Sequence, residues 1–297
     1  MVRDSGPYEE PPPLDAVAPA CSTQILAGVV ENVAIACRTY RLRLDAPAIA
    51  RAIKPGQFVM VRPSTTLDPL LGRPFALYEV VRSAGGEPDA IDVVYLVLGR
   101  GTAALSERKP GDLLSVWGPL GQPFGPPPQG DAIFVAGGIG QTPFLSLGKW
   151  WLGQAAYGEQ SFDRPAASAR MLYGVRTAEL AAGLPDFEAA GIPVEQATDD
   201  GSAGRRGFVT DLLRERLERG QRPAKVVGCG PPPMLRALSQ LVDEFSIPCD
   251  LSLENHMACG FGACFSCVAP IRQPDDSVDL RRVCVEGPTF PAGDVVW

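Results

Sequence analysis

The stretch Phe134-Val-Ala-Gly-Gly-Ile-Gly-Gln-Thr-Pro143 joins an apolar run to a helical pattern through a group of glycines. It predicts a strand over Asp131–Ala136, a tight turn over Gly137–Gly140 and a helix over Thr142–Leu152. Glycines at such a turn let the backbone approach a pyrophosphate, and the helix N-terminus supplies N–H donors and a favourable dipole. Glycine-rich turns also serve packing, and this stretch is not the G-x-G-x-x-G fingerprint. Both interpretations stay open on this stretch alone.

The segments that follow alternate between strand and helix patterns. Such alternation predicts βαβ units around a parallel sheet, as in an α/β nucleotide-binding domain. The predicted strands are Ala169–Gly174, Val194–Ala197, Ala224–Gly228 and Pro248–Leu253, and the predicted helices are Pro185–Ala190, Val209–Arg219 and Met234–Phe245.

A second turn in this region, Val226-Val-Gly-Cys-Gly-Pro-Pro-Pro-Met234, again ends a strand and opens a helix. Cys229 lies between two glycines at the carboxyl end of its strand, where open α/β sheets bind their ligands. The thiol is therefore a candidate contact for a nicotinamide ring. Free cysteines are equally common as small buried hydrophobic residues, and this alternative stays open.

The region before residue 125 consists of short β-type runs separated by Pro and Gly. Runs with this spacing predict an antiparallel β-barrel, with one short helix over Thr102–Arg108. The predicted strands are Thr23–Val30, Tyr40–Leu44, Gln57–Arg62, Ala76–Val81, Ile91–Leu98 and Leu113–Trp117.

Two motifs in the barrel are candidates for phosphate binding. In Leu71-Gly-Arg-Pro-Phe-Ala-Leu77, the guanidinium of Arg73 can fork onto a phosphate. In Gly99-Arg-Gly-Thr-Ala-Ala-Leu105, Gly101 and Thr102 open a helix that can bind a further phosphate oxygen. On barrel evidence alone, an exposed surface charge is the preferred interpretation of Arg73.

The C-terminal region carries four cysteines as Cys259-x4-Cys264-x2-Cys267-x16-Cys284. The first three have the spacing of plant-type [2Fe–2S] sites, in which one loop and one distant segment hold the cluster. The glycines between them let backbone N–H groups approach the bridging sulfides. A structural zinc site is the alternative, but zinc sites usually pair their cysteines in two knuckles. The spacing therefore favours an iron–sulfur cluster.

Two strand patterns follow, Val268–Arg272 and Ser277–Val285, around the turn Gln273–Asp276. They predict a hairpin that returns Cys284 to the other three cysteines. The single histidine, His256, is interpreted as a local packing or hydrogen-bonding residue. With one histidine, hydrolytic triads are excluded.

The composition limits the class of protein further. The chain has 297 residues, and its net charge of −7 without a Lys/Arg run argues against a nucleic acid partner. No apolar stretch reaches the ~20 residues that span a bilayer, and the first residues lack the apolar core of a secretion signal. We therefore expect a cytoplasmic location, where cysteines indicate metal, redox or packing roles. Cys21, Cys37 and Cys249 are interpreted as small hydrophobic residues.

Taken together, the motifs resemble the ferredoxin–NADP reductase superfamily. The resemblance is carried by the stretches from Ala136 to Pro143, Cys229 to Met234, Arg73 to Ala76 and Thr198-Asp-Asp-Gly-Ser-Ala-Gly204. The C-terminal Leu253-Glu-Asn-His-Met-Ala-Cys-Gly-Phe-Gly-Ala-Cys-Phe-Ser-Cys267 and Arg282-Val-Cys-Val-Glu-Gly-Pro-Thr-Phe290 resemble the electron-transfer subunits of class 1B dihydroorotate dehydrogenases. The resemblance covers roughly residues 22–297.

This resemblance implies FAD on the barrel, NAD(H) on the α/β domain and a [2Fe–2S] cluster on a C-terminal lobe, with no catalytic acid or base among the side chains. The implied FAD contacts are Arg73, Pro74, Phe75, Ala76, Val94, Tyr95, Leu96, Gly101 and Thr102. The implied nicotinamide cofactor contacts are Gly137, Gly138, Gly140, Thr142, Pro143, Cys229, Gly230 and Pro231. The implied cluster ligands are Cys259, Cys264, Cys267 and Cys284.

Two positions depart from the family pattern. The family often has Ser or Thr at the position of Ala76, with its hydroxyl on flavin N5, so a backbone N–H has to substitute here. A basic residue commonly follows the tyrosine equivalent to Tyr95, whereas this chain has Leu96. One contact to a phosphate or to the flavin edge is therefore expected to be missing.

We expect a mobile Pro-rich tail over 1–20, an FAD-binding barrel over 21–127, an NAD-binding α/β domain over 128–250 and a cluster-binding lobe over 251–297. The resemblance implies a partner, the FMN-containing catalytic subunit, in a heterotetramer that passes electrons from dihydroorotate to NAD+. Phe261 and Phe265 are candidates for the partner interface or for packing over the cluster.

Two other functions stay open at this point. The first is an NAD(P)H-linked subunit of a ferredoxin:NADP oxidoreductase or a hydrogenase. In that case Arg205 and Arg206 either bind the 2′-phosphate of NADP or are solvated loop charges. The second is a zinc-bound scaffold without redox activity.

Overall fold

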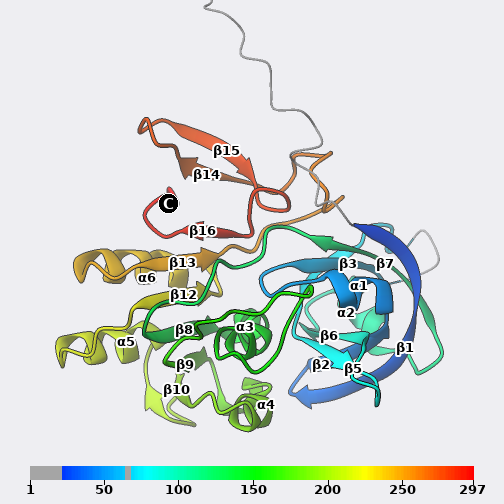
Figure 1. The fold of residues 1–297 in the computed structure, drawn as a ribbon, viewed down its shortest axis with the longest axis horizontal. Coiled ribbons are helices and arrows are strands. Elements are labelled where there is room, and N and C mark those ends of the chain that lie inside the picture. Colours follow the sequence, from blue (N-terminus) through cyan, green and yellow to red (C-terminus); the bar gives the residue numbers. More distant parts are fainter. Residues whose placement is uncertain (1–21, 64–67) are drawn as a thin grey trace, which may run out of the picture.

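The computed structural model of the chain describes residues 22–63 and 68–297. The tail predicted for residues 1–20 and the interpretation of Cys21 lie outside these ranges. The described part contains two seven-stranded sheets and one two-stranded hairpin. In Figure 1 the first sheet lies on the right, the second lies on the left with its helices, and the hairpin lies above them. The predicted barrel, α/β sheet and C-terminal lobe are confirmed.

The first sheet consists of strands β1 (Thr23–Ala36), β2 (Thr39–Asp45), β3 (Phe58–Arg62), β4 (Arg73–Ala76), β5 (Glu79–Arg82), β6 (Pro88–Leu96) and β7 (Leu113–Leu120). Their order is β4-β3-β7-β1-β2-β6-β5, and all neighbours are antiparallel. Side chains alternate between the two faces of each strand. In β2, for example, Leu42 and Leu44 are fully buried, and Arg43 between them is not. The buried side chains fill a curved, barrel-like sheet.

One predicted barrel strand is divided in the structure. The run Ala76–Val81 is interrupted between β4 and β5, where the N–H groups of Leu77 and Tyr78 bond to the carbonyls of Gln57 and Asp92. The chain changes its partner segment at this point. A run of apolar residues does not reveal such a change, because it depends on contacts between distant segments.

The described part of the barrel region contains two helices, α1 (Pro47–Ala52) and α2 (Arg100–Ser106), where the sequence predicted one. The predicted Thr102–Arg108 corresponds to α2, which begins two residues earlier. Helix α1 has six residues, too few to establish a 3.6-residue apolar period. Its residues Ile49 and Ala50 are buried, and the helix packs against β6.

The second sheet consists of strands β8 (Asp131–Gly137), β9 (Ser168–Val175), β10 (Val194–Thr198), β11 (Arg205–Arg206), β12 (Lys225–Cys229), β13 (Cys249–Ser252) and β16 (Thr289–Pro291). Its helices are α3 (Phe144–Trp151), α4 (Leu184–Ala189), α5 (Val209–Glu218) and α6 (Pro232–Glu244), with short 3₁₀ helices η2 (Gly138–Gln141) and η3 (Ala178–Leu180).

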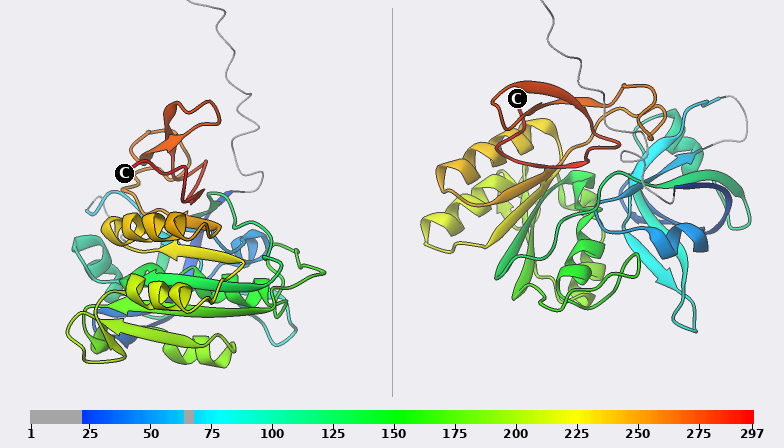
Figure 2. Two further views of the ribbon diagram at one scale, coloured as in Figure 1. Left: turned by 90° about the vertical axis from the view of Figure 1, so that its left-hand side faces the viewer. Right: turned by 45° about the horizontal axis from the view of Figure 1, so that its top comes forward.

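The strand order of this sheet is β11-β10-β9-β8-β12-β13-β16. The strands from β11 to β13 are parallel, as predicted, and β16 adds an antiparallel edge strand from the C-terminal region. Helices α5 and α6 lie together on one face of the sheet, and α3 lies on the other face, next to β5 of the barrel (Figure 2).

The first glycine turn differs from the prediction in one respect. The turn predicted over Gly137–Gly140 is mostly the 3₁₀ helix η2, and α3 begins at Phe144 instead of Thr142. Pro143 lies at the boundary between the two helices, because it has no N–H to donate to the preceding turn.

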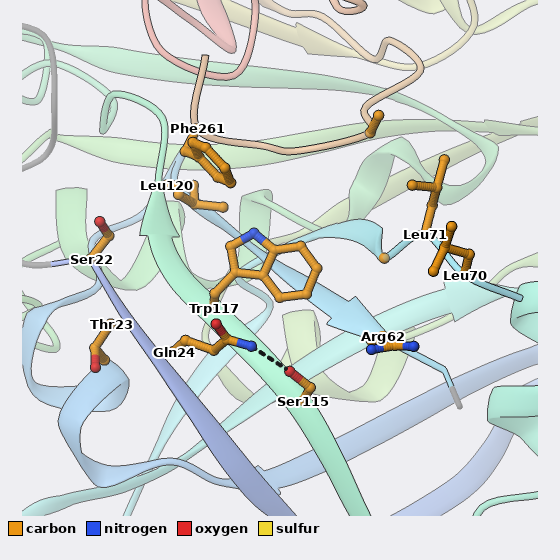
Figure 3. A pocket seen from close by; sticks show the side chains of 12 residues that line it. Ser22, Thr23, Gln24, Arg62, Leu70, Leu71, Ser115, Trp117, Leu120 and Phe261 are labelled. Carbon is orange, nitrogen blue, oxygen red and sulfur yellow. Dashed lines mark hydrogen bonds between the residues drawn. The ribbon is translucent and has the colours of Figure 1, made fainter. Parts of the chain in front are cut away.

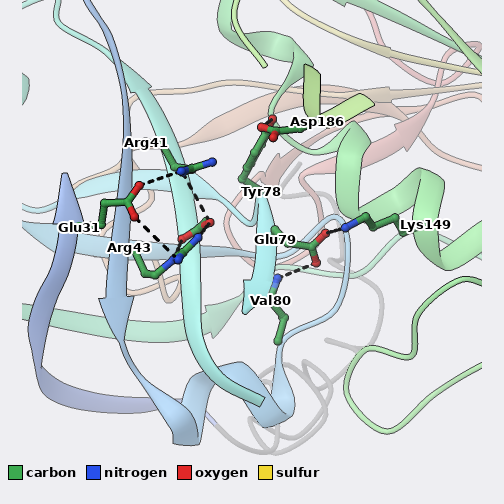
Figure 4. A network of polar contacts seen from close by, with 9 residues as sticks. Glu31, Arg41, Arg43, Tyr78, Glu79, Val80, Lys149 and Asp186 are labelled. Carbon is green, nitrogen blue, oxygen red and sulfur yellow. Dashed lines mark hydrogen bonds and ion pairs between the residues drawn. The ribbon is translucent and has the colours of Figure 1, made fainter. Parts of the chain in front are cut away.

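Polar contacts join the barrel to the α/β sheet (Figure 4). The hydroxyl of Tyr78 donates to Oδ2 of Asp186 in α4 at 2.6 Å, and Nζ of Lys149 in α3 pairs with Glu79 of β5 at 2.6 Å. Burial, followed by the bond to Asp186, raises the pKa of Tyr78, so that its hydroxyl stays protonated and remains a donor. These bonds fix the two sheets to each other.

The C-terminal hairpin is formed by β14 (Val268–Arg272) and β15 (Val278–Arg282), as predicted. Cys284 lies in one apolar core with Met60 and Leu120 of the barrel, so the lobe packs onto the barrel. Within the described ranges, no helix has both the length and the apolar character that a membrane-spanning helix requires.

Candidate cofactor sites

The four predicted cluster ligands lie together. Cys259, Cys264 and Cys267 belong to the cluster loop, residues 259–267, and Cys284 follows the hairpin. The Cys264 thiol interacts with Cys259, and the Cys284 thiol interacts with Cys267. The N–H of Val283 donates to the carbonyl of Cys267 at 2.9 Å and so returns the chain to the loop. The Cys284 thiol also interacts with Cys259, so the four thiols form one group whose stronger contacts are the pairs Cys259–Cys264 and Cys267–Cys284.

This pairing bears on the choice between an iron–sulfur cluster and zinc. A structural zinc ion needs its ligands around one point, whereas in a Cys₄ [2Fe–2S] cluster the ligands are shared between two irons. Two pairs of thiols fit the two-iron group.

The two pairs differ in their electrostatic environment. Cys264 is exposed, and the Ser266 hydroxyl at 3.1 Å, with the N–H groups of Ser266 and Cys259, lowers the pKa of Cys264 to about 6. Burial, with the neighbouring Cys267 thiol, raises the pKa of Cys284 to about 12. Metal ligation requires thiolates. The thiolate form is therefore favoured at Cys264 and disfavoured at Cys284 when no metal is bound.

The glycines of the cluster loop are needed for conformation and for packing. Gly260 and Gly262 have φ values of +82° and +88°, a region that disfavours other residues. A Cβ on Gly260 would lie 2.5 Å from Cγ of Met60, and one on Gly262 would lie 2.7 Å from Cγ2 of Val285. The loop thus contacts the barrel at one glycine and the segment of Cys284 at the other.

The structure brings Arg73 together with the start of helix α2. A Cβ on Gly101 would lie 2.9 Å from Nε of Arg73, so only glycine leaves room for the guanidinium there. Nη1 of Arg73 donates to the carbonyls of Leu71 and Gly72 at 2.9 and 3.1 Å, which fixes the side chain. The Thr102 hydroxyl accepts the N–H of the preceding Leu98 and Gly99 at 3.0 and 3.3 Å. A guanidinium beside a helix N-terminus fits a phosphate of FAD.

The other residues expected at the FAD site differ in how deeply they are buried. Phe75, Val94 and Tyr95 are buried, and the rings of Phe75 and Tyr95 contact each other with their centroids 5.7 Å apart. The Tyr95 hydroxyl donates a hydrogen bond to the side chain of Asn32. Leu96 is half-buried, as are Pro74 and Ala76. These accessible residues and Arg73 are the ones that a flavin can reach.

At the position where a basic residue is missing, another cation lies close by. Leu96 pairs with Thr39 across β2 and β6. Arg38, the residue before Thr39, donates a hydrogen bond from Nη2 to the carbonyl oxygen of Val97 at 2.5 Å. The turn between β1 and β2 thus places a guanidinium one residue beyond Leu96.

The two glycine turns of the α/β sheet pack against each other. A Cβ on Gly140 would lie 2.3 Å from the carbonyl oxygen of Cys229, and one on Gly230 would lie 3.0 Å from Cα of Gly137. Gly138, with φ +56°, has open space where its Cβ would be. The packing interpretation of the glycines therefore holds for Gly137, Gly140 and Gly230, and Gly138 leaves an accessible backbone surface for a ligand.

The remaining predicted nucleotide contacts are partly accessible. Thr142 and Pro143 are buried behind η2, whereas Pro231 is exposed at the start of α6. Cys229 is buried, and burial, with the charge of Glu254, raises the pKa of its thiol. The thiol therefore stays protonated, and the interpretation as a buried small residue agrees with its environment.

Sequence reasoning missed Glu254. It lies two residues after the end of β13, at the same edge of the sheet as Cys229. Its side chain is exposed at the surface, and partial loss of hydration raises its pKa. The rule that singled out Cys229, a polar residue at the carboxyl end of a parallel strand, would also have found Glu254.

Four further interpretations can be compared with the structure. Arg205 pairs with Glu215 of α5, so it is not a free charge, while Arg206 is exposed. Phe261 and Phe265 of the cluster loop are 58% and 61% exposed, and the guanidinium of Arg282 lies 4.9 Å from the ring centroid of Phe265, so an interface role and packing over the cluster both stay predictions.

Cys37 and Cys249, two cysteines outside the cluster site, are both predicted from the sequence to be small hydrophobic residues, and the structure confirms this for only one of them. Cys249 is buried, as predicted, but Cys37 is exposed in the turn between β1 and β2, so its interpretation as a core residue is wrong. Apolar composition around a cysteine does not reveal a turn. His256 is exposed, and its backbone N–H donates to the side chain of Asn255 while its backbone carbonyl accepts from Ser266 at 3.4 Å, so the role of its imidazole stays a prediction.

Comparison with known proteins agrees with this arrangement. Residues 254–296 match the iron–sulfur cluster binding domain of dihydroorotate dehydrogenase B, and residues 134–240 match the oxidoreductase NAD-binding domain. A solved structure from a study of flavin-based electron bifurcation by the NADH-dependent reduced ferredoxin–NADP oxidoreductase is 26% identical. It has a TM-score of 0.76, and the match covers 92% of this chain and 90% of that one.

The similarity to curated sequences extends over nearly the whole chain. The dihydroorotate dehydrogenase B (NAD+) electron transfer subunit of Desulforamulus reducens is 36% identical over 91% of this chain and 97% of its own length. The subunit of the same name from Geobacillus thermodenitrificans is 38% identical, over 90% of this chain and 96% of its own length. The chain therefore belongs to the family of dihydroorotate dehydrogenase B electron transfer subunits.

Proposed function

We propose that this protein passes electrons from the FMN of a dihydroorotate dehydrogenase catalytic subunit to NAD+. The observation that carries the proposal is the set of four thiols, arranged in two pairs, beside a barrel with a phosphate-binding arginine and a sheet with nucleotide-binding turns. A [2Fe–2S] cluster supplies one-electron transfer, FAD couples one-electron to two-electron steps, and NAD+ takes a hydride. The side chains bind and orient these groups.

The proposed division of labour follows the three parts of the fold. Residues 21–127 bind FAD through Arg73 and the turn at Gly101–Thr102, residues 128–250 bind NAD, and residues 251–297 bind the cluster. The proposed ligands of the cluster are Cys259, Cys264, Cys267 and Cys284. No side chain is assigned as an acid or base.

The proposal includes a catalytic partner subunit, with two copies of each chain in the assembly. Exposed aromatic side chains are enriched in interfaces, and Phe261 and Phe265 project from the cluster loop. Electrons have to enter at this loop, so we place the partner against it. A cytoplasmic location belongs to the same proposal, since exposed thiolates require a reducing compartment.

The test is dihydroorotate-dependent reduction of NAD+ by the purified chain with a catalytic subunit from the same organism. The wild-type pair is expected to be active, and a Cys264→Ser variant is expected to lose the cluster and at least about 100-fold of the activity. Cys37→Ser, which changes an exposed cysteine in the turn between β1 and β2 and outside the cluster loop, is the matched control and is expected to leave the activity intact. Equal activity of Cys264→Ser and the wild type would contradict the proposal.

A second candidate function is favoured by the similarity to the NADH-dependent reduced ferredoxin–NADP oxidoreductase structure. In this case the chain would serve as an NAD(P)H-linked flavin and iron–sulfur subunit of another complex. A preparation that carries FAD and iron, reacts with NADH or NADPH, and fails with every dihydroorotate dehydrogenase catalytic subunit of the organism would favour this candidate.

A further inference from the structure

Trp117, on the outer face of β7, contacts two segments that are distant in sequence. Its Nε1–H donates to the carbonyl oxygen of Cys259 in the cluster loop at 2.9 Å. The other end of the indole lies over Gly72, where a Cβ would be 2.5 Å from Cη2. The carbonyl of Gly72 accepts a bond from Arg73 at 3.1 Å. One side chain thus links the peptide of a cluster ligand to the turn that holds the flavin-binding arginine.

The barrel face around Trp117 supports the cluster loop. Met60 lies directly opposite Trp117 on the neighbouring strand β3, so both side chains are on the same face. Gly260 of the loop packs against Met60 and Leu120. The loop therefore rests on this face, and the indole N–H supplies the hydrogen bond that fixes its position.

The indole also forms a wall of a pocket of about 470 Å³ between the barrel and the cluster loop. Figure 3 shows Trp117 with Phe261 of the loop on one side and Leu71 on another. Because this space is open next to the ring, the loop has room to move if the ring is lost. A displacement of about 1 Å between reacting groups can cost about 100-fold in rate.

We propose that Trp117 is a positioning residue that sets the distance and the coupling between the cluster and the flavin. The inference rests on the proposed function, because it takes the cluster and FAD as bound at the sites given above. Trp117 does not react. It holds the Cys259 peptide and the Gly72–Arg73 turn in one fixed relation, as a rigid side chain locked by packing and a hydrogen bond can do.

The test uses the full-length protein loaded with FAD and iron, without the partner subunit. NADH would deliver two electrons as hydride to the flavin, of which one would pass to the cluster and reduce one iron while the other would stay on the flavin. Trp117→Phe keeps a ring and removes the N–H, and Trp117→Leu removes both. Ser115→Ala, two residues earlier on the same face of β7 and in the same pocket, is the control. Anaerobic stopped-flow absorbance follows flavin reduction, and freeze-quench paramagnetic resonance follows cluster reduction.

Flavin reduction by NADH is expected to be unchanged in all variants. Cluster reduction is expected to slow about 10-fold in Trp117→Phe and about 100-fold in Trp117→Leu, with an altered resonance line shape of the reduced cluster. Ser115→Ala is expected to match the wild type. The inference is overturned if the Trp117→Leu variant reduces its cluster at the wild-type rate, or if flavin and cluster reduction slow equally. A wild-type protein without iron would overturn the proposed function and this inference together, whereas normal tryptophan variants would overturn the inference alone.

Discussion

The glycine turns of the α/β sheet and the cluster loop use glycine for different physical reasons. A Cβ added to Gly140 would lie 2.3 Å from the carbonyl oxygen of Cys229. A side chain at this position would therefore collide with the backbone at a buried strand end. Gly260 faces Met60 at 2.5 Å, so the obstacle is a flexible side chain. The nucleotide site is therefore built into the sheet, whereas the cluster loop is a separate segment that rests on the barrel.

The largest expected effect is that of Gly140→Ala. The new methyl group meets the backbone of Cys229, which cannot move without displacing β12, so we expect a loss of about 3 kcal/mol in the free energy of unfolding and loss of NADH binding. The control for stability is Gly138→Ala, where the methyl group enters the open space of the ligand surface and only the positive φ costs about 1 kcal/mol, so that NADH binding is lost without a comparable loss of stability. Urea denaturation and NADH titration measure both. Equal losses of stability in Gly140→Ala and Gly138→Ala would contradict the contrast between a backbone obstacle at Gly140 and open space at Gly138.

A smaller effect, which a second substitution can relieve, is expected for Gly260→Ala. The φ of +82° costs about 1–2 kcal/mol, and the methyl group collides with Met60, so the iron content is expected to fall while NADH binding remains. Because the collision is with a side chain, Met60→Ala is expected to relieve it. A double-mutant cycle, with Met60→Ala alone as the reference for its own cavity, is expected to give a favourable coupling of about 1 kcal/mol. If the effects of Gly260→Ala and Met60→Ala simply add, the methyl group at position 260 does not collide with Met60.

The smallest expected effect concerns Glu254, which lies between the two regions. Its folded-state pKa is raised above the ordinary 4.5 by loss of hydration, so the folded protein binds more protons than the unfolded chain above pH 4.5. The wild type therefore loses stability as the pH rises from 4.5 through the folded-state pKa, and Glu254→Gln is expected to lack this loss. The difference is small, because the side chain is exposed.

The control for Glu254 is a carboxylate with the opposite shift. The hydroxyl and the N–H of Ser277 lower the pKa of Asp275, so this group contributes stability that is lost as the pH falls. Asp275→Asn is expected to change the pH profile with the opposite sign. Urea denaturation across the pH range measures both variants. A Glu254→Gln profile parallel to the wild type would contradict the assigned environment.

The sequence by itself determined the class of fold, the cysteine ligand set as a hypothesis, and the family. These properties depend on residue spacing along the chain: alternating strand and helix patterns, glycines at two strand ends, and cysteines separated by four and by two intervening residues. Local periodicity carries this information, because neighbours in the sequence remain neighbours in a strand, a turn or a loop.

Only the tertiary structure decided which residues connect these parts. Trp117 and Cys259 are 142 positions apart, and no pattern around either residue indicates their bond. The same holds for the pairing of Tyr78 with Asp186 and for the obstacle that each glycine faces. Such contacts arise when independently patterned elements pack together, and their geometry depends on the three-dimensional arrangement of the sheets, which leaves no periodic trace in the sequence.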